Sequence, residues 1–133
     1  MTPVNFSAAS QILVDAYNAK AKTNKSAAYW SDDGVSEVRK EIKDHYIGEQ
    51  GHRCAYCRQP NYTGNNAVWD AEHVISKQQN PEFMFEPRNL AISCKDCNIA
   101  KGEQEVRTTK KVSFPRVDSL RSRTWHAQVA TRL

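Results

Sequence analysis

The sequence predicts a small α+β domain in which two helices precede a strand, a loop, a second strand and a third helix. Three observations support this fold class. The 133 residues are enough for about one ordinary domain. Apolar residues recur at helical spacing in the first fifty positions, and β-prone segments follow them. Two C-x-x-C pairs enclose the β-prone part of the chain.

Residues 1–53 are expected to form a helical N-terminal extension. Apolar side chains follow a helical spacing in residues 7–22, and they do so again in residues 34–50. Ser31 is a plausible start for the second helix and Gly51 a plausible stop. We expect both helices to pack on the unit that follows, and the sequence indicates no separate function for them.

The four cysteines predict a structural zinc site. Two C-x-x-C turns supply the four thiolates of a tetrahedral site, and these are Cys54, Cys57, Cys94 and Cys97. Two disulfides or a redox-active dithiol are the alternatives, but nothing in the sequence indicates an oxidising compartment. A zinc ion held by four thiolates has no open position, so it would support folding and perform no chemistry.

The 36 residues between the two cysteine pairs exceed the roughly 15–20 of a simple zinc ribbon, so further structure is expected there. Residues 68–75 are β-prone, residues 76–88 form a polar loop with two prolines, and residues 89–93 predict a second short strand. A helix is expected to begin at Cys97. Residues 54–106 therefore make up the predicted core.

This core resembles the HNH endonuclease family, in its four-cysteine zinc-knuckle type with a His-Asn-Asn signature. The resemblance covers about residues 54–102 and is carried by Glu72-His73, Asn89-Leu90, Cys94-x-x-Cys97 and Asn98-x-x-Lys101-Gly102. It implies a ββα-metal nuclease core, hydrolysis of DNA phosphodiester bonds to products with a 5′-phosphate, and an Asn89 that orients the His73 loop through hydrogen bonds. The family often has Asp at the position of Glu72 and His at that of Asn98, and both replacements keep a metal-binding oxygen.

The side-chain chemistry of the predicted catalytic set (His73, Glu72, Asn89 and Asn98) agrees with such a reaction. His73 can take a proton from water as the general base. Glu72 and Asn98 offer hard oxygen ligands for a catalytic divalent ion, Mg²⁺ or Mn²⁺. Adjacent strand residues point to opposite faces, so a bend or bulge is expected where Glu72 and His73 meet one site. Asp70, on the same face as Glu72, either assists the metal or is exposed.

The basic charge is concentrated at the C-terminal end. Residues 101–133 carry a net charge of +5, whereas residues 1–100 carry −1. The basic tail, residues 107–133, is expected to contact DNA phosphates together with the end of the core, through Lys101, Lys110, Lys111 and Arg116. The alternative for this tail is a solvated surface.

The sequence therefore predicts a metal-dependent HNH endonuclease that acts on DNA. The alternatives are a non-catalytic zinc-knuckle module that binds nucleic acid and a structural zinc adaptor that binds another protein. No export signal or membrane span is indicated, so we expect a cytoplasmic protein of bacterial or phage origin. The resemblance extends to small proteins of anti-phage defence, in which a partner protein would supply targeting or activation. The chain is also compatible with the front of a longer protein.

Overall fold

Helices occupy the N-terminal half of the chain, and an antiparallel hairpin with one further helix follows. The computed structural model describes residues 1–102, and Lys110, Lys111 and Arg116 lie outside the described residues. The elements are α1 (Ala8–Asn18), α2 (Ser36–Glu49), β1 (Trp69–His73), β2 (Leu90–Cys94) and α3 (Lys95–Lys101), joined by short 3₁₀ turns. The α+β class is confirmed. Within residues 1–102, no helix has the length and apolar character that a membrane crossing requires.

The helix boundaries follow from side chains that bond to nearby backbone groups. The Ser7 side chain accepts a hydrogen bond from the Ser10 backbone and thereby caps α1. The second helix begins five residues later than the start expected at Ser31, because the Asp32 carboxylate accepts a 2.7 Å bond from the Gly34 backbone. That bond closes a separate turn before α2. Gly51 follows α2 with φ +59°, a conformation that favours glycine, as expected for the stop.

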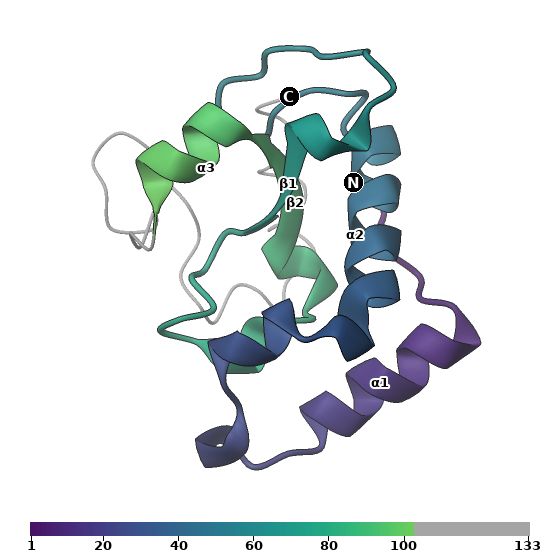
Figure 1. Cartoon of the computed structure of the whole chain (residues 1–133), viewed down its shortest axis with the longest axis vertical. Coiled ribbons are helices and arrows are strands. Elements are labelled where there is room, and N and C mark those ends of the chain that lie inside the picture. Colours follow the sequence, from purple (N-terminus) through teal and green to yellow (C-terminus); the bar gives the residue numbers. More distant parts are fainter. Residues whose placement is uncertain (103–133) are drawn as a thin grey trace.

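The hydrophobic core lies between α2 and the hairpin. Val38, Ile42 and Tyr46 are spaced four residues apart on α2 and are 0% exposed. They share one cluster with Trp69 of β1 and with residues of β2. Figure 1 shows the hairpin between α2 on one side and α3 on the other. In the described residues α2 therefore packs against both strands of the hairpin.

The hairpin presents two chemically different faces. Its register is regular and runs from Trp69 opposite Cys94 to His73 opposite Leu90, so the bulge expected beside His73 is not present in this pairing. Since side chains alternate, Trp69 and His73 lie on the face that joins the core with α2. Asp70 and Glu72 lie on the opposite face, toward α3.

The contact between α3 and β1 is made by polar side chains. Lys95, Asn98 and Lys101, at helical spacing on α3, all bond to the carboxylates of Asp70 and Glu72 on β1. No apolar residue of α3 is buried. A helix and a strand that meet through ions in place of apolar side chains leave a polar seam inside the folded unit.

Candidate functional site

The four cysteines come together where the first C-x-x-C turn, residues 54–57 (the first knuckle), meets the end of β2 and the start of α3. Their Sγ atoms all lie within 4.8 Å of one another, and the Sγ atoms of Cys57 and Cys94 are 3.8 Å apart. Zinc–sulfur bonds of about 2.3 Å in a tetrahedron place the sulfurs about 3.8 Å apart. The four thiols are free. The cluster therefore has the composition and spacing of a metal site, as the sequence predicts.

Backbone groups hold the cysteines in this arrangement. The Cys54 sulfur accepts N–H bonds from Tyr56 and Cys94, and the Cys94 sulfur accepts one from Cys97, each at 3.4 Å. Burial opposes ionisation of Cys54, but the backbone N–H groups outweigh burial and lower the pKa of its thiol. The Ala55 N–H donates to the Ile92 carbonyl and ties the first knuckle to β2.

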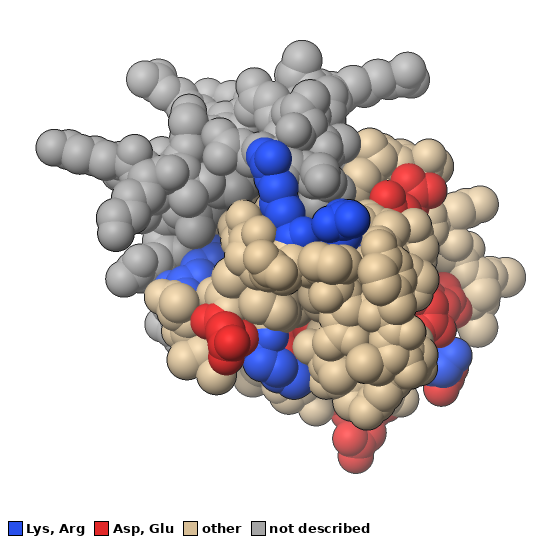
Figure 2. All heavy atoms as spheres, turned by 90° about the horizontal axis from the view of Figure 1, so that it is seen from above, with Lys and Arg blue, Asp and Glu red and all other residues tan. Residues whose placement is uncertain are grey.

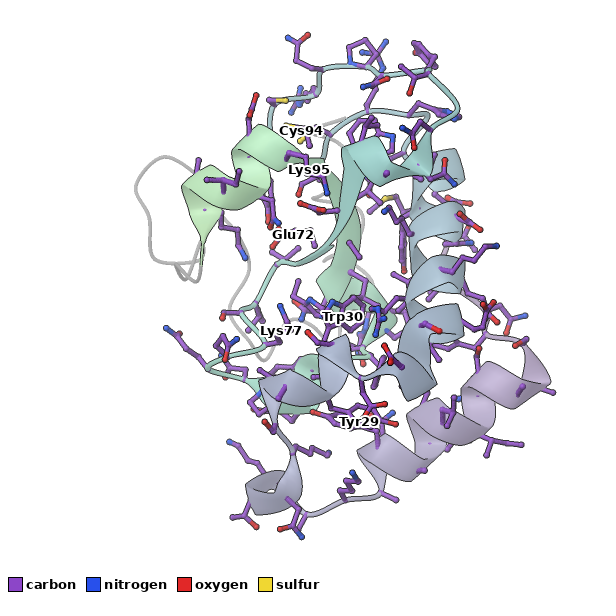
Figure 3. The ribbon with its side chains drawn as sticks, in the orientation of Figure 1. Tyr29, Trp30, Glu72, Lys77, Cys94 and Lys95 are labelled. Carbon is purple, nitrogen blue, oxygen red and sulfur yellow. The ribbon has the colours of Figure 1, made fainter. Side chains whose placement is uncertain are left out.

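A second polar site lies at the open edge of β1, in a cavity of ≈ 280 Å³. In the described part of the chain β1 pairs with β2 alone, so its other edge is accessible to side chains from both faces of the strand. His73 from one face and Asp70 from the other both line the cavity, together with Trp30, Lys77, Asn98 and Lys101. Glu72, the direct neighbour of His73, does not line the cavity, so the strand needs no bulge to bring Asp70 and His73 to it. In Figure 3, Trp30 and Lys77 lie near the end of the strand, and Glu72 lies between the strand and α3.

His73 is held as a neutral imidazole. Its side chain is buried, its Nε2 lies 3.0 Å from the carbonyl oxygen of Met84, and its ring meets the Trp30 ring edge-on at 4.5 Å between centroids. A carbonyl only accepts hydrogen bonds, so Nε2 carries the proton and Nδ1 keeps its lone pair. Burial, assisted by the charge of Lys77, lowers the pKa of His73 to about 3. The imidazole is therefore an unprotonated base at neutral pH.

Asn89 fastens the loop that follows His73. Its side chain is fully buried, its Oδ1 accepts a 2.7 Å bond from the Ile75 N–H, and its Nδ2 donates to the carbonyls of Ile75 and Phe83, both at 3.2 Å. These bonds fix the path of the chain directly after β1. They are the contacts expected of a residue that orients the His73 loop.

Glu72 and Asn98, the two expected metal ligands, bond to different partners in the polar seam between β1 and α3. Glu72 is 2% exposed, and its Oε1 accepts a 2.6 Å bond from Lys101, which also donates to the His73 carbonyl at 2.7 Å. Burial raises the pKa of Glu72, and the Lys101 ammonium opposes that shift. Asn98 instead donates to Asp70 Oδ2 at 2.8 Å. The expected ligands Glu72 and Asn98 are thus each bonded to a different residue in this structure.

Several cavity residues could not be found from the sequence. Trp30 belongs to the 3₁₀ turn Ala27–Ser31, in a segment for which no function was expected, and only tertiary packing brings it to His73. Ser76, Lys77 and Gln78 also line the cavity. Their position a few residues after Glu72-His73 was the one feature of the sequence that could have placed them near the site. Lys101, expected at DNA, lies in a buried ion pair, with 7% of its side chain exposed.

Charge on the described part of the surface is mixed. On the face shown in Figure 2, lysine and arginine side chains lie scattered among acidic ones. This agrees with the net charge of −1 carried by residues 1–100. The expected phosphate contacts of Lys110, Lys111 and Arg116 fall outside the described residues.

The chain was also compared with protein-family models, with curated proteins and with solved structures, and none of the three comparisons gives a match.

Proposed function

We propose that the protein is a metal-dependent endonuclease of the HNH type that hydrolyses DNA phosphodiester bonds. In this proposal β1, β2 and α3 form the ββα-metal core, and a zinc ion bound by the four cysteines stabilises it. The observation that carries the proposal is the position of His73. It is a neutral imidazole of fixed tautomer, and it lines a polar cavity with one carboxylate, two amides and two lysines.

His73 would act as the general base on a water molecule in this cavity. The Met84 carbonyl holds Nε2–H, so Nδ1 is the nitrogen that can take the proton from water. A pKa of about 3 would make the imidazole a weak base. A bound phosphate brings negative charge into the cavity, which stabilises the imidazolium and moves its pKa upward during the reaction.

Lys77 lines the same cavity and adds positive charge where a phosphate oxygen would lie. Asn89 would keep the loop that carries Lys77 in place, through its bonds to Ile75. A bound divalent ion supplies the charge neutralisation that the pentacovalent phosphate and the departing oxygen require. The resemblance further predicts that the protein cleaves phage DNA in the bacterial cytoplasm and that a partner protein targets or activates it.

Supercoiled plasmid DNA tests the proposal against its alternatives. The full chain, loaded with zinc and then freed of other ions, is incubated with plasmid in buffer alone, with Mg²⁺ and with Mn²⁺. We expect nicked or linear plasmid only when one of the two ions is added. Intact plasmid that still shifts in a gel would favour the non-catalytic nucleic-acid-binding module. Intact plasmid without binding would favour the protein-binding zinc adaptor.

A further inference from the structure

We propose that Asp70, rather than Glu72, is the carboxylate that holds the divalent cation, with Asn98 as its companion ligand. This inference rests on the proposed function and assigns the metal site of the same cavity. It follows from differences in accessibility, counterions and neighbouring oxygen atoms between the two carboxylates on β1.

The accessible carboxylate of the seam is Asp70. Its side chain is 25% exposed, and it lines the cavity together with His73 and Asn98. It also lines a neighbouring cavity of ≈ 380 Å³ that shares Trp30 with the first. Glu72 is only 2% exposed. Among residues 1–102, the carboxylate that lines this cavity is that of Asp70, not that of Glu72. A hydrated ion that enters this cavity therefore meets Asp70 first.

The counterions of the two carboxylates differ in how easily they can leave. Lys95 pairs with Asp70 and keeps 54% of its side chain exposed, so its ammonium can move into water at small cost. Lys101 pairs with Glu72 and is only 7% exposed. Its displacement would leave a buried ammonium and the His73 carbonyl without their bonds. A divalent ion can thus replace the lysine at Asp70 far more easily than the lysine at Glu72.

Two side chains that carry an oxygen atom neighbour Asp70. The Asn98 amide lies 2.8 Å from Asp70 Oδ2 through its nitrogen, and half a turn of the amide would present Oδ1 to an ion bound there. Ser93 lies opposite Asp70 in the register and is 0% exposed. Its hydroxyl has no hydrogen-bond partner among residues 1–102. One carboxylate and one amide oxygen, with water completing the shell, suit an ion such as Mg²⁺.

Glu72 has a structural role in this arrangement. It joins β1 to α3 through Lys101, and burial together with the Glu72 charge raises the pKa of Tyr56, which follows the first cysteine of the zinc cluster. Its carboxylate therefore lies in the interior that links the zinc cluster, β1 and α3. Replacement of Glu72 should lower stability more than cation affinity.

Terbium(III) titration of the zinc-loaded full chain tests the assignment directly. Tb³⁺ is a hard, oxygen-seeking ion, and its luminescence is excited by energy transfer from a nearby tryptophan such as Trp30. We expect Asp70→Asn to weaken Tb³⁺ binding by at least about tenfold, because the charged ligand is lost. Glu72→Gln should bind within about threefold of the unchanged protein. Asp44→Asn, at a carboxylate of the neighbouring cavity, is the matched control and should bind normally.

Unchanged Tb³⁺ binding in Asp70→Asn would overturn the assignment, and so would loss of binding in a folded, zinc-containing Glu72→Gln. If Glu72→Gln does not fold, Glu72→Gln combined with Lys101→Met removes both charges of the pair and is used in its place. Tb³⁺ binding that depends on Asp70 in a protein that leaves plasmid intact would sink the nuclease proposal alone. Plasmid cleavage that Asp70→Asn retains in full would sink only the metal assignment.

Discussion

Replacement of His73 by glutamine should remove a pH dependence from the stability of the protein. The unfolded histidine has a pKa of about 6.5, whereas burial in the folded protein lowers the pKa to about 3. Between these values the unfolded chain binds more protons than the folded one, so the free energy of unfolding rises with pH. The contribution of neutral His73 to the free energy of unfolding is therefore fully present above about pH 6.5 and is lost as the pH falls toward 3.

The size of the effect follows from the two pKa values. From pH 7 to pH 5 the unfolded histidine becomes almost fully protonated while the folded one stays neutral. Linkage then lowers the free energy of unfolding by about 2 kcal/mol over this interval. Glutamine does not titrate, and its amide can donate to the Met84 carbonyl in place of Nε2–H. The variant should therefore lack this 2 kcal/mol of pH dependence.

Urea unfolding at pH 7 and pH 5, with zinc in excess, measures the difference. Proton competition at the four thiolates weakens zinc binding in both proteins, so it cancels when the variant is compared with the unchanged protein. We expect the unchanged protein to lose about 2 kcal/mol more than His73→Gln between the two pH values. Equal losses would refute the conclusion that His73 is buried as a neutral imidazole.

Three further results are expected. Elemental analysis should find one zinc ion per chain, and Cys54→Ser or zinc removal should lower the melting temperature; a chain that keeps its fold without zinc would contradict this. Lys101→Met should cost about 3–5 kcal/mol in urea unfolding because it leaves Glu72 charged and buried, and added Glu72→Gln should restore most of that loss. Equal stability of the single and double variants would count against the ion pair. Replacement of Lys110 and Lys111 by alanine should flatten the slope of log DNA affinity against log salt by about two units. An unchanged slope would show that these two lysines do not contact DNA phosphates.

Local patterns were sufficient for the helices, the two strands and the cysteine cluster. Apolar spacing predicted α2 because Val38, Ile42 and Tyr46 bury one stripe. The C-x-x-C spacing predicted the cysteine cluster because each short turn can aim two sulfurs at one point. The start of α2 was missed because Asp32 closes a turn of its own with Gly34.

Pairing within the candidate site could not be predicted in the same way. Asp70 and Glu72 lie on one face of β1, so their spacing in the sequence does not indicate which of the two would bind a metal ion. The difference between them depends on which lysine of α3 is buried, and burial is a property of the packed structure. The bulge expected beside His73 is not present, and Glu72 does not share the cavity with His73.

Cleavage of supercoiled plasmid by His73→Ala, in parallel with the unchanged protein, tests the catalytic proposal most directly. Both proteins are loaded with zinc, supplied with Mg²⁺ and used at saturating DNA. We expect the variant to cleave at least about 100-fold more slowly, as loss of a general base requires, while its zinc content and DNA affinity stay unchanged. Equal cleavage rates in the two proteins would contradict the assignment of His73 as the base.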